Sequence, residues 1–470
     1  MVASSTTTVG GLLVSLDRGS GTPAHLQLET SIRDAIRDGR VTGGSRVPST
    51  RRLADELGVS RGVVVEAYQQ LVAEGYLVSQ AGGPTRVAAG VAGDPPFAIE
   101  EAPSPPLADV VDFRYGRPDV SQFPRAAWLR SLRTILTEAP HEQLNYLDGR
   151  GALELRTALA DYLNRVRGTW ASPQNLIVCN GFAQAVSLLM PVLRQQGVTT
   201  LAVEDPSDSD AVRVARSAGL EVVGIPVGDA GIDVAWLESS GADAVLVTPA
   251  HQFPTGCVLS PEGRAGLVAW ARSGDRVIIE DDYDAEYRYD QTPVGALHGL
   301  APDHVVYAGT TSKTLAPGIR LGWMVAPARF VDALATQRLE LDRGSPVIEQ
   351  LAFAEFLRNG DFDRHLRRMR PLYRRRRDRL LERMSALLPE LTPVGIAAGL
   401  HVFSWLPDDL PEPLIVDTAG RHGVIINGVA GYHVDRAHRG GLIFGYGKLS
   451  EDAIDRGIAV LRQTFDEVVR

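Results

Sequence analysis

The chain has 470 residues, of which 44% are hydrophobic and 22% are charged, and its formal net charge is −9 at pH 7. This composition is typical of soluble globular proteins, the length suits about three domains, and the charge excludes a protein that is basic throughout. The sequence contains two cysteines, no signal peptide and no apolar run near the roughly 18 residues of a membrane span. We therefore expect a reduced, cytoplasmic protein with no membrane partner.

The N-terminal residues predict an arm followed by a helix. Residues 1–17 are rich in Ser, Thr and Gly with one short apolar patch, so we expect a flexible arm. Over residues 23–38 the apolar side chains recur at helical spacing, and Gly39 closes the pattern.

The next residues predict a helix-turn-helix. Ser49 or Thr50 can cap the start of a short helix, Gly58 can end it, and Ser60 can cap a second helix that runs to about residue 74. Two helices joined by a short turn with a glycine form this motif. Residues 76–87 then read as a small hairpin, the wing of a winged helix.

The charges of residues 18–88 are consistent with DNA binding. This segment holds nine arginines against seven acidic residues, a net charge of +2 in a chain of net −9. Several of these arginines fall at predicted helix starts or in the wing, where phosphate and base contacts are made. The DNA-binding candidates are Arg46, Ser49, Arg51, Ser60, Arg61, Thr85 and Arg86. The alternative is a small helical domain with a solvated basic face.

Specific strings support the DNA-binding interpretation. They are Pro48-Ser49-x-Arg51-x-Leu53-Ala54, Gly58-Val59-Ser60-Arg61, Ala67-Tyr68 and Glu74-Gly75-Tyr76-Leu77. Together they resemble the GntR winged-helix family, and this resemblance implies that residues 18–88 bind promoter DNA.

A boundary follows, and then a larger domain. Residues 89–109 are rich in proline without periodicity, as in a semi-rigid linker. From residue 110 to the C-terminus at 470, short apolar runs alternate with helical patterns, which predicts a multidomain α/β protein whose second domain has a mostly parallel sheet covered by helices. A smaller α+β region ends the chain. The arginine-rich run 367–379 is either a solvated helix face or a second DNA contact.

Two strand ends of this domain offer polar groups, and ligands bind at such ends in open α/β sheets. The motif 180–185 follows a strand and precedes an apolar helix, so the backbone N–H groups of Phe182 and Ala183 can meet a phosphate. The run 278–283 is an apolar strand that ends in acids, including Asp281, followed by Tyr283.

Lys313 is the most informative residue of the chain. Of 48 Lys and Arg residues only Lys313 and Lys448 are lysines, and arginine cannot supply a free primary amine. Thr310, Thr311 and Ser312 precede Lys313 and Arg320 follows it, and hydroxyls with a guanidinium suit a phosphate. An amine beside a phosphate site is the arrangement that holds a phosphorylated aldehyde as a Schiff base.

The strand end at Asp281 fits the same cofactor. A pyridine ring needs a carboxylate to keep its nitrogen protonated, and Asp281 can supply it. Tyr283 can hydrogen-bond the phenolic oxygen of the ring.

The segment 109–470 resembles a fold-type I aminotransferase, and with the GntR-like domain the chain resembles the MocR-type transcriptional regulators. The resemblance rests on the motifs at 113–119, 146–156, 251–256, 280–284 and 307–323. It implies pyridoxal 5'-phosphate as cofactor, an internal aldimine at Lys313, and a phosphate held by Thr310, Arg320 and the backbone of Phe182 and Ala183. It also implies a head-to-tail homodimer in which Tyr146 reaches the site of the second subunit.

The chain departs from the aminotransferase pattern at two positions. Ser207-Asp208 replaces a Gly-Tyr pair whose ring stacks on the cofactor, and Ile443 occupies the position of an arginine that binds the substrate carboxylate. An apolar side chain cannot replace that guanidinium. We therefore hypothesise that the effector is pyridoxal phosphate itself or an amine without a conventionally bound carboxylate.

Three functions stay open. The first is a transcription regulator that senses a ligand through Lys313. The second is a working aminotransferase with an accessory DNA-binding domain. Residual transaminase activity would indicate this function. The third is a DNA-binding protein whose large domain is only a dimerisation scaffold.

Overall fold

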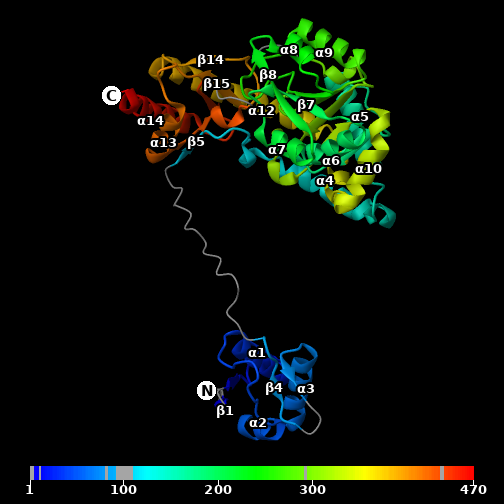
Figure 1. Cartoon of the computed structure of the whole chain (residues 1–470), viewed down its shortest axis with the longest axis vertical. Coiled ribbons are helices and arrows are strands. Elements are labelled where there is room, and N and C mark those ends of the chain that lie inside the picture. The colour runs from blue at the N-terminus through cyan, green and yellow to red at the C-terminus, as the bar shows by residue number, and fades with distance from the viewer. Residues whose placement is uncertain are drawn as a thin grey trace. The chain divides into compact units, whose positions relative to one another are not determined.

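The computed structural model describes residues 5–9, 12–79, 83–91, 110–289, 294–434 and 439–469, with side chains from residue 16 onward. The chain divides into two compact units, Met1–Pro106 and Leu107–Arg470 (Figure 1). Most of the predicted linker, from residue 92 to 109, lies outside the described residues.

The first unit is a winged helix. Its helices are α1 (Ala24–Arg37), α2 (Thr50–Leu57) and α3 (Arg61–Ala73), and its wing strands are β3 (Leu77–Val78) and β4 (Arg86–Val87). The Ser49 hydroxyl accepts a hydrogen bond from the Arg52 N–H at 3.3 Å and so caps α2. Gly58 ends α2 in the left-handed conformation at φ 63°, which glycine adopts without strain. The predicted helix-turn-helix and wing are confirmed.

The predicted flexible arm is wrong for most of its length. Strands β1 (Ser5–Val9) and β2 (Leu12–Leu16) pair antiparallel, and the Leu16 side chain is buried in the core of the winged helix. Thr and Val are β-branched and favour strands, so the composition that looked loose also suits a small sheet.

The second unit is built on an eight-stranded sheet of order β6-β13-β12-β11-β10-β7-β8-β9. All neighbours pair parallel except at β13, which is antiparallel to β12 and β6, and at β9, which is antiparallel to β8. The strands are β6 (Leu176–Cys179), β7 (Thr200–Asp205), β8 (Glu221–Gly228), β9 (Gly231–Ile232), β10 (Ala244–Val247), β11 (Val277–Asp282), β12 (Val305–Thr310) and β13 (Gly322–Val325). The predicted mostly parallel sheet is confirmed.

Both faces of this sheet are buried. Successive side chains of a strand point to opposite faces, and neighbouring residues of β10 accordingly enter different cores, Leu246 one and Val247 another. Helices lie on both sides of the sheet (Figure 1). They are α4 (Arg125–Glu138), α5 (Leu153–Arg167), α6 (Phe182–Gln195), α7 (Ser209–Ser217), α8 (Val234–Ser239), α9 (Pro261–Ser273), α10 (Ala328–Asp342) and α11 (Val347–Arg358). None of the described helices is both long and apolar enough to cross a membrane.

The C-terminal part forms the predicted smaller α+β region. Its sheet has the order β14-β15-β18-β17, and β16 pairs parallel with β5. The elements are β5 (Val111–Asp112), α12 (Asp361–Leu387), β14 (Thr392–Val394), β15 (His401–Trp405), α13 (Glu412–Arg421), β16 (Val424–Ile425), β17 (Asn427–Gly428), β18 (Gly441–Gly445) and α14 (Glu451–Val469).

The arginine-rich run 367–379 lies in α12 and helps to hold this unit together. Arg376 is buried and donates to Asp119 at 2.7 Å, and Arg379 pairs with Asp455 at 2.6 Å. Arg367, Arg368, Arg374 and Arg375 are exposed, so the run is in part the solvated helix face that was expected and in part a set of structural ion pairs.

Candidate functional site

The strand ends of the large sheet surround a cavity of about 180 Å³. All the predicted cofactor residues except Tyr146 line it. The lining residues are Tyr115, Phe182, Ala183, Glu204, Ser207, Asp208, Leu246, Val247, Thr248, Phe253, Asp281, Tyr283, Thr310, Ser312, Lys313 and Arg320. The cavity brings an amine, carboxylates and a guanidinium together.

Lys313 follows β12 and projects into this cavity. Its Nζ donates to the Gly116 carbonyl at 3.1 Å and lies 5.8 Å from the centre of the Tyr115 ring. Burial lowers the pKa of the Lys313 amine, against the opposing effect of Asp281, Asp284 and Asp208. A lowered pKa enlarges the fraction of neutral amine, which is the nucleophilic form.

Asp281 lies near the end of β11 with one buried oxygen, Oδ1, that has no hydrogen-bond partner among the described residues. Burial raises the pKa of Asp281 well above its ordinary value, and Asp208 and Asp282 add to this effect. A buried carboxylate oxygen without a partner is costly. A protonated ring nitrogen in the cavity would satisfy it, and the predicted cofactor therefore fits at this position.

Another side of the cavity offers groups that can bind a phosphate. Helix α6 begins after Gly181 (φ 88°), so the N–H groups of Phe182 and Ala183 stand at its positive end. The Arg320 guanidinium donates to the Asn180 carbonyl, and a Cβ built on Gly181 would lie 3.4 Å from it. That distance is an ordinary contact, and it is the positive φ at residue 181 that favours glycine here.

Two hydroxyls add to these phosphate-binding groups. Thr310 donates from Oγ1 to the Ser312 hydroxyl at 3.0 Å, and both side chains line the cavity. Hydroxyls, helix N–H groups and a guanidinium together form a phosphate-binding set.

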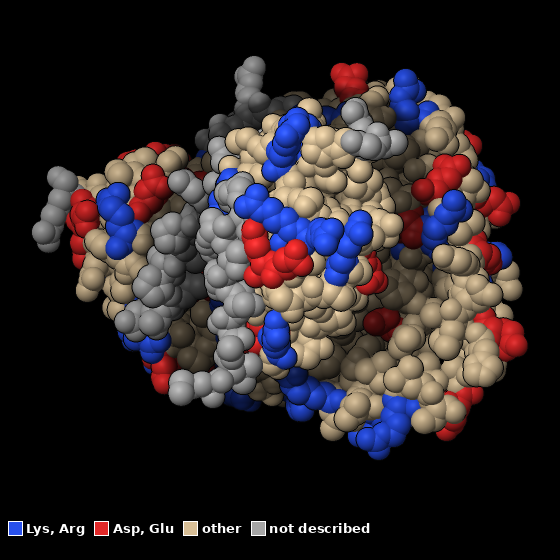
Figure 2. Space-filling model, turned by 90° about the horizontal axis from the view of Figure 1, so that it is seen from below, with Lys and Arg blue, Asp and Glu red and all other residues tan. Residues whose placement is uncertain are grey.

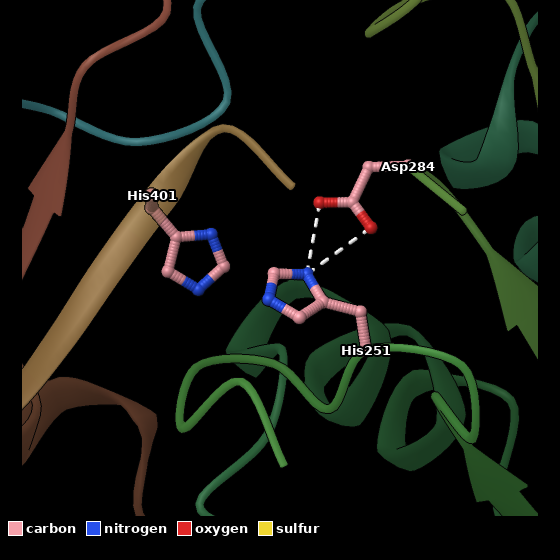
Figure 3. A group of neighbouring side chains, drawn as sticks. All are labelled: His251, Asp284 and His401. Atoms are coloured by element: carbon pink, nitrogen blue, oxygen red, sulfur yellow. Dashed lines mark hydrogen bonds and ion pairs between the residues drawn. The ribbon is translucent and has the colours of Figure 1, made fainter. Parts of the chain in front are cut away.

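Tyr283 belongs to a buried network that the sequence did not reveal. Its hydroxyl donates to the His251 carbonyl at 3.0 Å, and His251 Nδ1 lies 3.0 Å from Asp284 (Figure 3). His401 enters from β15 and its Nε2 donates to the Pro254 carbonyl at 3.0 Å, while burial lowers the pKa of His401 to about 4.

Nitrogen and carboxylate atoms of His251, Asp284 and His401 lie within 4.8 Å of one another, but existing hydrogen bonds already occupy Nδ1 of His251 and Nε2 of His401. Hydrogen bonding within the protein is therefore sufficient to explain this cluster.

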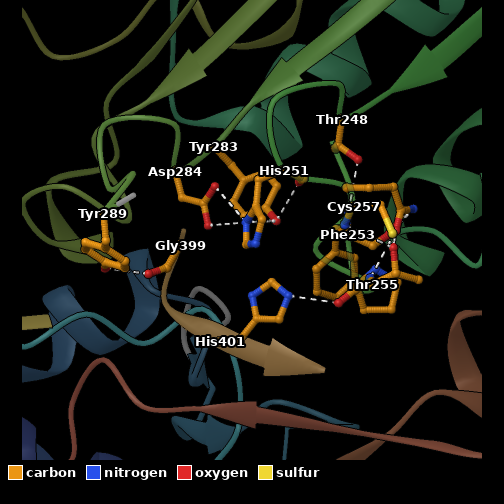
Figure 4. Close-up of polar contacts among 12 residues, drawn as sticks. Thr248, His251, Phe253, Thr255, Cys257, Tyr283, Asp284, Tyr289, Gly399 and His401 are labelled. Atoms are coloured by element: carbon orange, nitrogen blue, oxygen red, sulfur yellow. Dashed lines mark hydrogen bonds and ion pairs between the residues drawn. The ribbon is translucent and has the colours of Figure 1, made fainter. Parts of the chain in front are cut away.

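The loop after β10 holds Phe253 against the cavity. The Phe253 N–H donates to the Thr248 hydroxyl at 3.0 Å, and the Thr255 N–H donates to the Gln252 side chain at 3.0 Å (Figure 4). Phe253 and Tyr115 lie 4.3 Å apart, centre to centre. Neither ring was predicted as a site residue, because a lone aromatic residue in a loop carries no distinguishing pattern.

Tyr146 is not in the cavity of its own chain. Its side chain is 84% exposed and borders a separate hollow with residues 342–347. Its predicted contribution to a second subunit's site remains a prediction.

Of the two departures from the aminotransferase pattern, Asp208 lines the cavity and Ile443 does not. Asp208 lines the cavity at the start of α7, and its side chain accepts from the Asp210 N–H at 3.0 Å. Burial raises the pKa of Asp208. Ile443 is fully buried in β18, where it packs with Phe253 and Phe403.

The predicted DNA-binding residues lie on the winged helix, where all are exposed except Thr85, which is half-buried. Arg61 donates to the Thr50 hydroxyl at 3.4 Å, which joins the starts of α2 and α3, and the Val47 N–H donates to the Thr85 carbonyl at 3.1 Å, which joins the wing to this region. Within the described part of the chain, Arg46, Arg51, Arg61 and Arg86 form no ion pair, whereas Arg33, Arg40 and Arg52 do.

The arginines without ion pairs leave positive charge for phosphate. Figure 2 shows basic and acidic side chains interspersed on the molecular face that it displays.

Comparisons with known proteins agree with both units. Residues 108–434 match the family model "Aminotransferase class I and II", and residues 25–87 match "Bacterial regulatory proteins, gntR family". The chain is 33% identical to the HTH-type pyridoxine biosynthesis transcriptional regulator PdxR of Corynebacterium glutamicum, covering 94% of this chain and 96% of that protein. It is 31% identical to the probable rhizopine catabolism regulatory protein MocR of Rhizobium meliloti, covering 96% of each.

Among solved structures, the Pyrococcus horikoshii kynurenine aminotransferase in complex with PMP matches with a TM-score of 0.72 and 25% identity. The match covers 77% of this chain and 92% of the enzyme.

Proposed function

Because this chain belongs to the MocR-type transcriptional regulators, in which a gntR-family domain is joined to an aminotransferase class I and II domain, we propose that its large unit is a ligand sensor. The sensor binds pyridoxal phosphate at Lys313, and the occupant of the cavity changes how the winged helix binds a promoter. The observation that carries the proposal is the convergence of the Lys313 amine and the unpartnered Asp281 oxygen on one cavity.

Each predicted residue has a task in holding the cofactor. The Lys313 amine faces the aldehyde, Asp281 holds a proton on the ring nitrogen, and Arg320 with the start of α6 binds the phosphate. Tyr283 lines the ring site, with its hydroxyl held by the His251 carbonyl. When bound, pyridoxal phosphate supplies an aldehyde that reacts with primary amines and a ring that accepts electrons.

The regulatory step is a population shift. A ligand can change DNA binding only if its binding free energy differs between two arrangements of the protein. We place these arrangements in a cytoplasmic, head-to-tail homodimer in which Tyr146 completes the partner's site. The 84% exposure of Tyr146 supports this assignment, because a large aromatic side chain gains by burial at an interface.

A working aminotransferase is the second candidate. The similarity to the kynurenine aminotransferase and the positions of Lys313, Asp281 and Tyr283 favour it. The apolar packing of Ile443 opposes it, because no guanidinium stands there to bind a substrate carboxylate. Conversion of added amino acids at catalytic rates would establish the enzyme.

The test is the visible absorption spectrum of the full-length protein with pyridoxal phosphate, followed by promoter binding with and without the cofactor. Lys313→Ala should lose the absorption band and the ligand response. Lys448→Ala is the matched control, because Lys448, the other lysine of the chain, pairs with Asp112 at 2.9 Å outside the cavity and should keep the band. A band unchanged in Lys313→Ala would refute the cofactor site, and a promoter affinity unchanged by any cavity ligand would leave the large unit as a scaffold.

A further inference from the structure

The acidic side chains that line the cavity outnumber the basic ones, and the cofactor does not engage all of them. The basic groups among the lining residues are Lys313 and Arg320, and the acidic groups are Glu204, Asp208 and Asp281. The cofactor engages Lys313, Arg320 and Asp281. Glu204 accepts hydrogen bonds from Thr248, and burial raises its pKa to about 7, so only part of its charge remains at neutral pH. Asp208 is the remaining acidic group of the lining; burial raises its pKa as well, and the charges of Lys313 and Arg213 oppose this effect.

Asp208 is placed to meet a ligand. Within the described residues it forms no ion pair, and its side chain accepts one hydrogen bond, from the Asp210 N–H at 3.0 Å. The nearby Arg213 pairs instead with Asp210 at 2.8 Å, on the exposed side of α7. A carboxylate oxygen accepts more than one hydrogen bond, so Asp208 has acceptor capacity directed at the cavity that it lines.

Two aromatic residues, Tyr115 and Phe253, line the cavity together with Asp208, and the Tyr432 ring packs against both. The ring centres of Tyr115 and Phe253 are 4.3 Å apart, those of Phe253 and Tyr432 are 5.2 Å apart, and those of Tyr115 and Tyr432 are 6.1 Å apart. Burial raises the pKa of Tyr432 to about 12, and the Asp208 charge adds to this effect. Aromatic faces attract ammonium and guanidinium groups.

Among the described residues that line the cavity, none besides Lys313 and Arg320 offers a cation to an anionic ligand. Ile443 lies behind Phe253 in an apolar cluster with Phe403 and Val429, and the basic side chains of the lining are those that the cofactor uses. A ligand carboxylate brought here would meet Asp208 and lose its hydration without gaining a partner.

We propose that the effector sensed beside the cofactor is an aliphatic diamine, or a similar amine with a second cationic group and no carboxylate, whose second cation binds Asp208 against the rings of Tyr115 and Phe253. The inference rests on the proposed function, because it specifies the ligand class of the same cavity.

The test compares three ligands of one chain length on the full-length protein loaded with pyridoxal phosphate. Putrescine carries two amines, butylamine carries one, and 4-aminobutanoate replaces the second amine with a carboxylate. Dissociation constants come from calorimetry and from the change in the visible spectrum, and promoter affinity is measured at saturation. Putrescine should bind at least about tenfold more tightly than butylamine, and 4-aminobutanoate should bind most weakly.

Asp208→Asn removes the charge and keeps the helix cap, because asparagine caps helices as well as aspartate does. In this variant the preference for putrescine over butylamine should fall below about threefold. Asp210→Asn is the matched control two residues away, and it should keep the full preference. The absorption band of each variant reports that the cofactor has loaded.

The outcomes separate the inference from the proposed function. A wild-type protein that shows the band but does not distinguish the three ligands, or binds 4-aminobutanoate most tightly, overturns the diamine inference alone. A full preference retained in Asp208→Asn also overturns it. A wild-type protein without the band refutes the proposed function and this inference together.

Discussion

The strand that carries Asp281 is anchored by a buried ion pair, and removal of one partner should be strongly destabilising. Arg167 at the end of α5 donates to Asp282 at 2.6 Å, and both side chains are 3% exposed. The Tyr307 hydroxyl donates to the same carboxylate at 2.7 Å. Arg167→Met leaves this carboxylate without its buried cation, a change that costs about 3–5 kcal/mol of the free energy of unfolding.

A control substitution is available on the same helix, α5. Arg165, two residues earlier, pairs with Asp363 at 2.8 Å, but these side chains are 58% and 37% exposed. Exposed pairs contribute about 1 kcal/mol or less, so Arg165→Met should cost no more than that. The two variants remove the same chemical group and differ in the burial of the pair.

Tryptophan fluorescence during guanidinium denaturation reports the unfolding of the second unit, Leu107–Arg470, because all six tryptophans lie beyond residue 106. Equal losses in Arg167→Met and Arg165→Met would refute the reasoning. Adding Asp282→Asn to Arg167→Met should recover part of the loss, since it removes the unpaired charge.

Three further predictions concern the cavity and the DNA surface. Gly116→Ala should weaken cofactor loading while the protein stays folded, because φ is +76° and the added Cβ would lie 2.7 Å from Lys313 Nζ, which would have to shift, as absorbance and circular dichroism will show. Glu204→Gln should gain stability relative to the wild type as pH rises from about 4.5 to about 7, at up to roughly 1.4 kcal/mol per pH unit, because the wild-type carboxyl has a raised folded-state pKa and is stabilising while protonated. Arg61→Ala should weaken promoter binding and lower its salt slope by about one, whereas Arg40→Ala, whose arginine pairs with Asp38, should do neither.

Each of these has a contrary result. Normal loading in Gly116→Ala would mean that the Lys313 side chain moves aside and that the backbone tolerates alanine at this φ. A stability difference for Glu204→Gln that does not change with pH would mean that Glu204 ionises normally in the folded protein. Equal promoter affinity in Arg61→Ala and Arg40→Ala would remove Arg61 from the DNA surface.

The sequence alone determined the features whose signals are local. Ser49 and Gly58 cap and end one short helix within ten residues, so the helix-turn-helix was predictable from contiguous residues. The apolar strands were likewise predictable. Because parallel strands present their ends at one edge of a sheet, the order of strands and polar residues along the chain was enough to assign Asp281 and the lysine after β12 to one site.

Tertiary structure decided everything that depends on contacts between distant residues. Tyr115, Phe253 and Tyr432 come together from three separate segments, and His401 reaches the Pro254 carbonyl from 147 residues away. Whether Arg167 is buried against Asp282, or Asp208 left without a cation, follows from packing across the sheet. Such packing determines which charges lose their water and which find a partner, and no local sequence signal records it.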